Sequence, residues 1–141
     1  MRGVEMLDKA YAYVTREVKE EFELLVFTHR EADAGVQVPK GTVEPGERPR
    51  AAVVRELHEE SGLTDVEAVR PLAADTWEHP KKPKIYRRHF FHVPVTETRD
   101  TWTHTVTGDG EDVGTIYEYR WRPPTEVDLV SEMDAYLDQL L

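Results

Sequence analysis

Acidic residues crowd the segment between Gly41 and Gly62, and their spacing suits the binding of a cation. Glu56, Glu59 and Glu60 have i, i+3 and i+4 relationships, so on a helix they share one face within roughly 100°. Like charges at these spacings repel unless a cation lies among them. Clustered carboxylate oxygens suit Mg²⁺ or Mn²⁺, which commonly bind substrate phosphates as well. The segment predicts divalent-metal chemistry on phosphate, although a solvated glutamate-rich helix would contain the same acids.

The residues around these acids predict a helix that follows a loop. Pro49 suits the first helical turn, and Gly62 suits the position just past the last one. Arg48 would be the N-cap, where Ser, Thr or Asp is preferred. Val54 and Leu57 lie off the acidic arc, so we expect both to face a core.

The whole segment resembles, at every specified position, the signature of the Nudix hydrolase superfamily. The matching residues are Gly41, Glu47, Arg55, Glu56, Leu57, Glu59, Glu60, Gly62 and Leu63. The resemblance implies an enzyme that cleaves a diphosphate linked to another moiety, with Mg²⁺ or Mn²⁺ as cofactor. It also implies an α/β fold, namely an α/β/α sandwich with a mixed β-sheet, the loop-helix segment and a C-terminal helix.

The resemblance also implies the metal ligands. Glu59 and Glu60 correspond to direct ligands, and Glu56 corresponds to a ligand in some members and to the general base in others. The backbone carbonyl of Lys40, next to Gly41, corresponds to a further ligand. These five residues are the predicted metal site.

The catalytic assignment rests on the same resemblance. Arg55 corresponds to a residue that pairs with Glu47 and orients the catalytic glutamates, of which Glu56 is the candidate base. Water attacks one phosphorus, and positioning together with charge stabilisation supplies most of the rate enhancement. This chemistry explains why the segment contains acids and no Ser, Cys or His at its specified positions.

Length and composition limit the class of protein. The 141 residues are enough for one globular domain, 1–141, and the net charge of −10 makes long nucleic acid and anionic membranes poor partners. There are no cysteines, and no apolar run approaches a membrane span. The first ten residues lack the apolar stretch of a signal peptide, so we expect a cytoplasmic location. A small nucleotide is the expected partner, and a homodimer is left open.

Alternation and turn residues predict a mixed α and β order. The expected strands are 10–16, 22–29, 85–95 and 115–121, with extended pieces at 36–39 and 66–75. Residues 78–84 and 98–114 are predicted loops. Apolar residues at helical spacing after Thr125 predict the final helix; they are Val127, Val130, Met133, Leu137 and Leu140.

Two sets of residues outside the segment are candidates for the site. Nudix enzymes commonly recruit one more downstream acid, for which Glu111, Asp112 and Glu118 are candidates, although a surface role is open for each. The dense basic patch is His79, Lys81, Lys82, Lys84, Arg87 and Arg88. From this region and the loop we predict Lys40, Lys81, Lys82, Tyr86 and Arg88 as substrate contacts, against the alternative of a solvated loop and strand edge.

Two smaller resemblances concern the substrate. Residues 38–47 and the strand Tyr119-Arg120-Trp121 resemble diadenosine polyphosphate hydrolases and the related diphosphoinositol-type enzymes. Thr42 and Thr115 depart from the first group, and Pro80 is associated with the ADP-ribose branch instead. Dinucleoside polyphosphates are therefore the first expectation, with ADP-ribose or a nucleotide sugar second. Two further alternatives are a nucleotide sensor without turnover and an RNA 5′-end pyrophosphohydrolase. The intact glutamates argue against the sensor, and the acidic net charge argues against the RNA enzyme.

Overall fold

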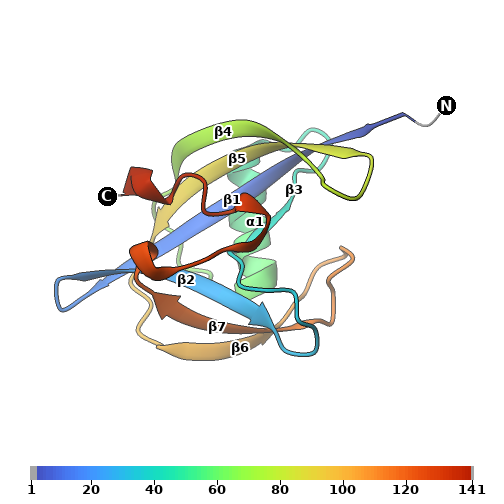
Figure 1. Cartoon of the computed structure of the whole chain (residues 1–141). Helices are drawn as coiled ribbons and strands as arrows, with labels where there is room; N and C mark the ends of the chain where they lie inside the picture. The colour runs from blue at the N-terminus through green and yellow to red at the C-terminus, as the bar shows by residue number, and fades with distance from the viewer. Residues whose placement is uncertain (1–2, 141) are drawn as a thin grey trace.

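The structure, a computed structural model, describes residues 3–140. These residues form seven strands, one α-helix and three short 3-10 turns (Figure 1). The elements are β1 (Glu5–Val18), β2 (Glu21–His29), β3 (Lys40–Thr42), α1 (Pro49–Ser61), β4 (Arg70–Glu78), β5 (Lys84–Pro94), β6 (Thr101–Thr105), β7 (Ile116–Arg122), η1 (Pro124–Glu126), η2 (Val130–Glu132) and η3 (Leu137–Leu140).

All seven strands belong to one mixed sheet of order β4-β5-β1-β2-β7-β6, and β3 pairs with β1 off this path. β1 runs parallel to β5, whereas the other pairings are antiparallel. On its other side β1 changes partner along its length, because residues 9–11 pair with β3 and residues 15–18 pair with β2. The sheet therefore splits beside β1 and leaves β3 as an edge strand.

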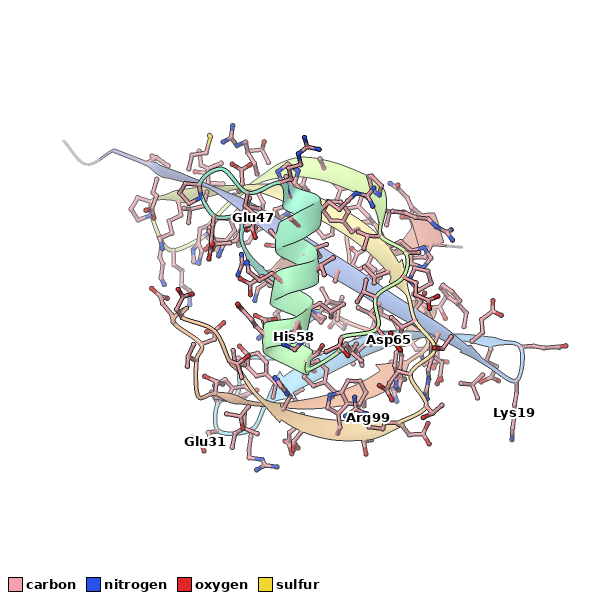
Figure 2. The ribbon with its side chains drawn as sticks, turned by 180° about the vertical axis from the view of Figure 1, so that it is seen from behind. Lys19, Glu31, Glu47, His58, Asp65 and Arg99 are labelled. Carbon is pink, nitrogen blue, oxygen red and sulfur yellow. The ribbon has the colours of Figure 1, made fainter. Side chains whose placement is uncertain are left out.

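Both faces of the sheet are covered, and each has its own core. Figure 2 shows α1 lying across one face, and Figure 1 shows the C-terminal segment across the other. Under α1, Ala52, Val53 and Leu57 pack on strand residues such as Phe27. Under the C-terminal segment, Met133 packs in a cluster with sheet residues of the opposite face. This three-layer mixed α/β arrangement confirms the predicted fold class.

The predicted helix begins and ends where the sequence indicated. Arg48 is extended (φ −81°, ψ 145°), Pro49 opens the first turn, and Gly62 follows the last with φ 80° and its N–H bonded to the carbonyl of His58. The left-handed φ at Gly62 is one that a glycine adopts without strain. Leu57 is buried as expected. Val54 is 38% exposed, so its predicted core position is wrong, and Val53 occupies the core instead.

The predicted C-terminal α-helix is wrong, because the segment forms η1, η2 and η3 with irregular backbone between them. Ser131 and Glu132 have φ of 54°, which an α-helix cannot contain. In this conformation their carbonyls accept hydrogen bonds from Nη1 of the buried Arg88. Leu129, Met133 and Leu137 are nevertheless buried, so the apolar pattern predicted the packing and not the helix type.

The predicted loop 98–114 contains the strand β6. Its sequence Thr-Trp-Thr-His-Thr alternates, and Trp102 stacks on Tyr119 of β7 with ring centroids 5.2 Å apart. The indole of Trp102 also donates to the carbonyl of Ser61, which ties β6 to the end of α1. The rest of the predicted loop, residues 98–100 and those after Thr105, has no regular structure, as expected. The alternation in β6 was the available signal.

Candidate active site

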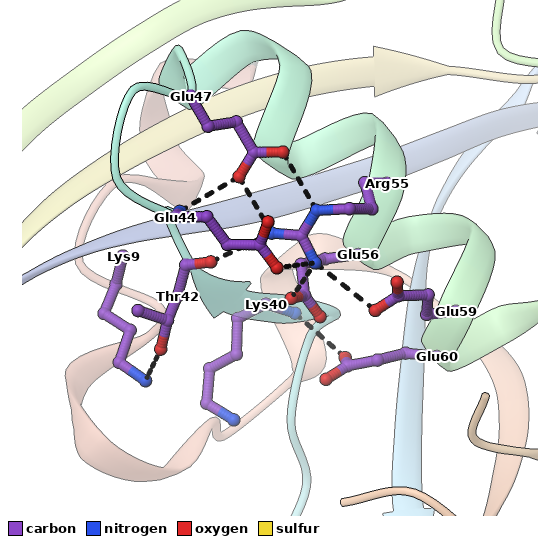
Figure 3. A network of polar contacts seen from close by, with 9 residues as sticks. All are labelled: Lys9, Lys40, Thr42, Glu44, Glu47, Arg55, Glu56, Glu59 and Glu60. Carbon is purple, nitrogen blue, oxygen red and sulfur yellow. Dashed lines mark hydrogen bonds and ion pairs between the residues drawn. The ribbon is translucent and has the colours of Figure 1, made fainter. Parts of the chain in front are cut away.

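A single guanidinium, that of Arg55 on α1, joins the loop to the acidic face of the helix (Figure 3). Its Nε and Nη2 donate to the two carboxylate oxygens of Glu47, each at 2.9 Å. Its Nη1 donates to Glu56 at 2.7 Å and to Glu59 at 3.3 Å. Nη2 also bonds to the carbonyl of Thr42 at 3.0 Å. Hydrogen bonds from Arg55 lower the pKa of Glu47, so this pair is ionised and fixed.

The third acid of the helix, Glu60, is buried with little compensation for its charge. Its side chain accepts the backbone N–H of Lys40 at 3.1 Å, and its residue is 3% exposed. Burial raises the pKa of Glu60 to about 8. The charge of Lys40 lowers this pKa, whereas the charges of Glu56 and Asp112 raise it further. Burial also raises the pKa of Glu56. Carboxylates in this state would be stabilised by a cation.

Two glycines leave space for these carboxylates. A Cβ on Gly41 would lie 2.0 Å from Cδ of Glu56, and a Cβ on Gly108 would lie 2.6 Å from Cδ of Glu59. Real Cβ contacts are never that short, so any other residue at either position would displace a glutamate. Gly41 also faces α1, since it pairs with Ala10 of the helix-side core.

The backbone of Lys40 is turned toward the same acids. The N–H of Ala12 bonds to Pro39 O, and the N–H of Val43 bonds to Asp8 O. Lys40 therefore lies in the alternate, non-hydrogen-bonded pairing with Tyr11, where both backbone groups point away from β1. Its N–H reaches Glu60, and its carbonyl points to the same side of the strand.

The donor set fits Mg²⁺ or Mn²⁺, because it consists of hard carboxylate and carbonyl oxygens. In the part of the chain that the structure describes, no three acidic or histidine side chains converge closely enough to hold an ion as they now lie. As Figure 3 shows, Arg55 Nη1 bonds to both Glu56 and Glu59. The raised pKa of Glu60 and the cradle at Gly41 are the observations that support the fit.

The glutamates form one wall of a cavity of about 510 Å³. The opposite wall contains Lys9, Lys40, Lys84 and Tyr86, and the loop after β6 contributes residues from Val106 to Val113. The Nζ of Lys9 donates to Thr42 Oγ1 at 2.8 Å and lies 5.0 Å from the centre of the Tyr86 ring. The cavity thus combines an acidic wall with a basic one.

A second cavity, of about 640 Å³, lies near Arg16 and His92 at the other end of β1. It is larger, but its principal cation is already paired. Arg16 is bonded to Glu23 and Asp100 and to two backbone carbonyls, and its guanidinium lies over Trp121. The smaller cavity, with its two charged walls, is therefore the candidate active site.

Family comparison matches residues 6–140 to the NUDIX domain. The chain belongs to the NUDIX family. Human diphosphoinositol polyphosphate phosphohydrolase 3-alpha is 34% identical to this NUDIX domain over 92 residues, which make up 65% of the chain and 53% of that protein. The domain thus spans about half the length of the curated relatives it matches.

Solved structures share the fold of this NUDIX domain. The NUDIX domain of NrtR from Shewanella oneidensis, complexed with ADP ribose, has a TM-score of 0.71 at 10% identity and covers 96% of this chain and 86% of that one. An Ap4A hydrolase from C. elegans has a TM-score of 0.64 at 19% identity and covers 95% of this chain and 94% of that one. At these identities the likeness shows the fold alone.

The NUDIX domain brings together only some of the residues predicted outside the signature. Lys40, Tyr86 and Glu111 line the cavity, as does Asp112. Glu118 does not, since it lies on β7 with its carboxylate 3.6 Å from the guanidinium of Arg30.

The predicted basic patch is divided by the structure. Lys81 and Lys82 are exposed in the turn between β4 and β5, outside the residues that line the cavity, and Lys84 lines it. Arg88 is 2% exposed and is bonded to both oxygens of Asp75, so its prediction as a substrate contact is wrong. A buried arginine with its hydrogen bonds made holds the C-terminal segment rather than a ligand.

Lys9 is one of the cavity residues that the sequence did not predict. It lies on β1, next to the start of the predicted strand, and its pKa is lowered by burial and then by the charges of Lys40 and Lys84. The only available signal was a lysine at the start of a mostly apolar strand, which the pattern alone does not separate from a surface residue.

Within residues 3–140, no helix is long and apolar enough to cross a membrane.

Proposed function

We propose that this NUDIX domain is a metal-dependent pyrophosphohydrolase that cleaves a diphosphate linkage in a nucleoside diphosphate derivative, with dinucleoside polyphosphates as the preferred class. The observation that carries the proposal is the cavity in which Glu56 and the buried Glu60, both with pKa values raised by burial, lie opposite a wall of lysines. In a chain of net charge −10, such an arrangement suits a ligand that brings cations and phosphates together.

Glu59, Glu60 and the carbonyl of Lys40 would hold the metal, with Glu56 as a further ligand or as the base. When bound, Mg²⁺ or Mn²⁺ neutralises phosphate oxygens and lowers the pKa of a coordinated water. Arg55 keeps Glu56 and Glu59 aimed into the cavity through its bonds to both. The burial that raises the pKa of Glu56 brings it toward the range in which a carboxylate works as a general base near neutral pH.

The reaction needs no covalent intermediate on the protein. Water attacks one phosphorus of the diphosphate, the bond from that phosphorus to the bridging oxygen breaks, and the second phosphate leaves with the bridging oxygen. A glutamate accepts the proton of the attacking water. Among the described residues that line the cavity there is no serine, cysteine or histidine, in keeping with direct attack by water.

The choice of substrate class rests on the basic wall and on the relatives. A curated relative is a diphosphoinositol polyphosphate phosphohydrolase and a structural neighbour is an Ap4A hydrolase, and both names favour a polyphosphate. The NrtR domain bound to ADP ribose favours the alternative, an ADP-ribose or nucleotide-sugar pyrophosphatase. A sensor that binds a nucleotide without turnover is the other alternative.

The test is a substrate panel of dinucleoside polyphosphates, nucleotide sugars, ADP-ribose, nucleoside triphosphates and capped RNA, each with Mg²⁺, Mn²⁺ or excess chelator. Phosphate-bearing products should form with metal only, and reaction in ¹⁸O-labelled water should place the label on one product phosphate. Glu59→Gln should lower kcat at least ~100-fold. Glu118→Gln, outside the cavity, is the matched control. Full turnover in chelator would overturn the proposal, and binding without turnover would favour the sensor.

A further inference from the structure

Three lysines from three different strands converge on one wall of the cavity. They are Lys9 of β1, Lys40 of β3 and Lys84 of β5. Lys9 and Lys40 donate to neutral acceptors, Thr42 Oγ1 at 2.8 Å and Gln37 Oε1 at 3.0 Å. Lys84 lies 3.6 Å from a carboxylate oxygen of Glu5, but Glu5 is exposed and Lys84 partly so, which weakens their attraction. The wall therefore carries positive charge with little direct neutralisation.

This charge is energetically unfavourable without a ligand. Burial lowers the pKa of Lys9, and the charges of Lys40 and Lys84 lower it further, while those of Glu56 and Asp112 raise it by a smaller amount. The three cations therefore repel one another in a partly desolvated place. An anion held between them would relieve the repulsion and form charge-assisted hydrogen bonds. Figure 3 shows the ammonium groups of Lys9 and Lys40 pointing the same way, on the side of β3 away from Glu47.

The lysines and the glutamates lie on opposite sides of the edge strand β3. Gly41 faces α1 and Glu56, whereas its neighbours Lys40 and Thr42 direct their side chains to the other face, because successive residues of a strand alternate. A ligand that contacts both walls must pass over this edge. A phosphate chain with its scissile bridge at the glutamates would place a further phosphate at the lysines.

The far side of the lysine wall is aromatic. The ring of Tyr86 lies under Lys9 Nζ, and Trp77 follows with its ring centre 5.5 Å from that of Tyr86. Both rings are half-buried, so each keeps some surface free. A nucleobase attached beyond the last phosphate could stack there, as bases do on aromatic side chains.

We propose that Lys9, Lys40 and Lys84 form a subsite for a phosphate outside the scissile diphosphate, and that Lys9 is a specificity-determining residue for chains of three or more phosphates. The proposal rests on the proposed function for the place of the scissile bond. The subsite itself is a binding site, so it can be tested without any turnover.

The first test measures binding in excess chelator. Inorganic tripolyphosphate and pyrophosphate are titrated into the protein by calorimetry at low ionic strength. Tripolyphosphate should bind more tightly than pyrophosphate. Lys9→Met should weaken the binding of tripolyphosphate about tenfold, the loss typical of one charge-assisted hydrogen bond. Lys9→Arg should keep most of the affinity, and Lys81→Met, in the exposed turn, should leave it unchanged. Equal binding of the two anions, unaffected by Lys9→Met, would overturn the subsite.

The second test measures specificity with metal present. Lys9→Met should lower kcat/KM for diadenosine tetraphosphate about tenfold, mainly by raising KM. For ADP-ribose, kcat/KM should stay within about twofold of the wild-type value. A merely structural role for the bond from Lys9 to Thr42 would lower both equally. Lys84→Met is a second variant at a more exposed position, should Lys9→Met fold poorly. Failure of turnover with intact tripolyphosphate binding would count against the proposed function and not against the subsite.

Discussion

Arg55 holds Glu47 by a two-pronged ion pair, with Nε bonded to one carboxylate oxygen and Nη2 to the other, both at 2.9 Å. The remaining nitrogen, Nη1, reaches the adjacent Glu56 and also Glu59, one turn further along the same helix. One planar group therefore sets the positions of the loop and of two acids together. A lysine has the same charge but lacks the fork that makes both sets of bonds at once.

Arg55→Lys should therefore keep the fold and lose turnover. We expect kcat to fall by about 10- to 100-fold, because the glutamates lose their aim while the helix keeps its buried face. The measurement is kcat with saturating Mg²⁺, together with the thermal midpoint. Arg48→Lys, at the exposed start of the helix, is the matched control. Wild-type turnover in Arg55→Lys would show that the fork has no role in positioning.

The raised pKa of Glu60 predicts a pH dependence of stability in the metal-free protein. The pKa of this carboxyl is about 8 in the folded protein and 4.5 as a free group. Between these two pH values the carboxyl is protonated in the folded state and ionised in the unfolded state. The contribution of Glu60 to the free energy of unfolding must then fall as pH rises from 4.5 to 8. Glu60→Gln removes this group, and in chelator the variant should be more stable than the wild type at pH 8.

Urea unfolding of both proteins between pH 4.5 and 8.5 in excess chelator checks this. The difference in free energy of unfolding should grow with pH, and saturating Mg²⁺ should stabilise the wild type at pH 8 far more than Glu60→Gln. Stability curves that stay parallel across this range would mean that Glu60 ionises as an ordinary carboxyl.

Gly41→Ala separates activity from stability. The new Cβ would meet Cδ of Glu56 at 2.0 Å, and since that atom is near the end of a flexible side chain, the carboxylate should move rather than the backbone. We expect kcat to fall at least ~10-fold, as misplacement of a catalytic group does, with the thermal midpoint changed by a few degrees at most. Gly3→Ala, where no described atom lies within 4 Å, is the control. An active Gly41→Ala would mean that Glu56 has freedom the structure does not indicate.

The downstream acids should differ in importance. Asp112 lines the cavity, and its charge adds to that of Glu56 in raising the pKa of Glu60, whereas Glu118 is near Arg30 outside it. Asp112→Asn should therefore lower kcat/KM by several-fold at limiting Mg²⁺, and Glu118→Gln should leave it unchanged. A metal titration of the two variants under identical conditions distinguishes them, and the reverse order would remove Asp112 from the site.

Local residues predicted the parts of the site that lie close together in the sequence. The helix between Pro49 and Gly62 followed from its local residues, whereas the pairing of Arg55 with Glu47 was implied by the family resemblance. Both depend on spacings within one segment. The position of Lys9 depends on the register of β1 with β3 and β5, which no single stretch of sequence specifies. Alternation could place Arg88 on one face of β5, but not identify that face as the one covered by the C-terminal segment.

The same dependence on contacts between distant residues explains why the predicted C-terminal helix is wrong. Its apolar residues are spaced for a helix, and propensity favoured one. The buried Arg88 needs carbonyl acceptors, and Ser131 and Glu132 provide them only with a backbone that a helix forbids. A tertiary hydrogen bond therefore outweighed a local preference, which is a common limit of sequence-based assignment.

The parallel pairing of β1 with β5 determines when the basic wall can exist. Asp8 and Arg87, partners in that pairing, are 79 residues apart in the chain, with α1 between them. Contacts of such long range form slowly, because a large loop must close before any of them contributes. The acidic turn of α1 can form locally and early, whereas Lys9 and Lys84 meet only after the central strands have docked. During refolding, recovery of polyphosphate binding should therefore lag behind recovery of helical signal.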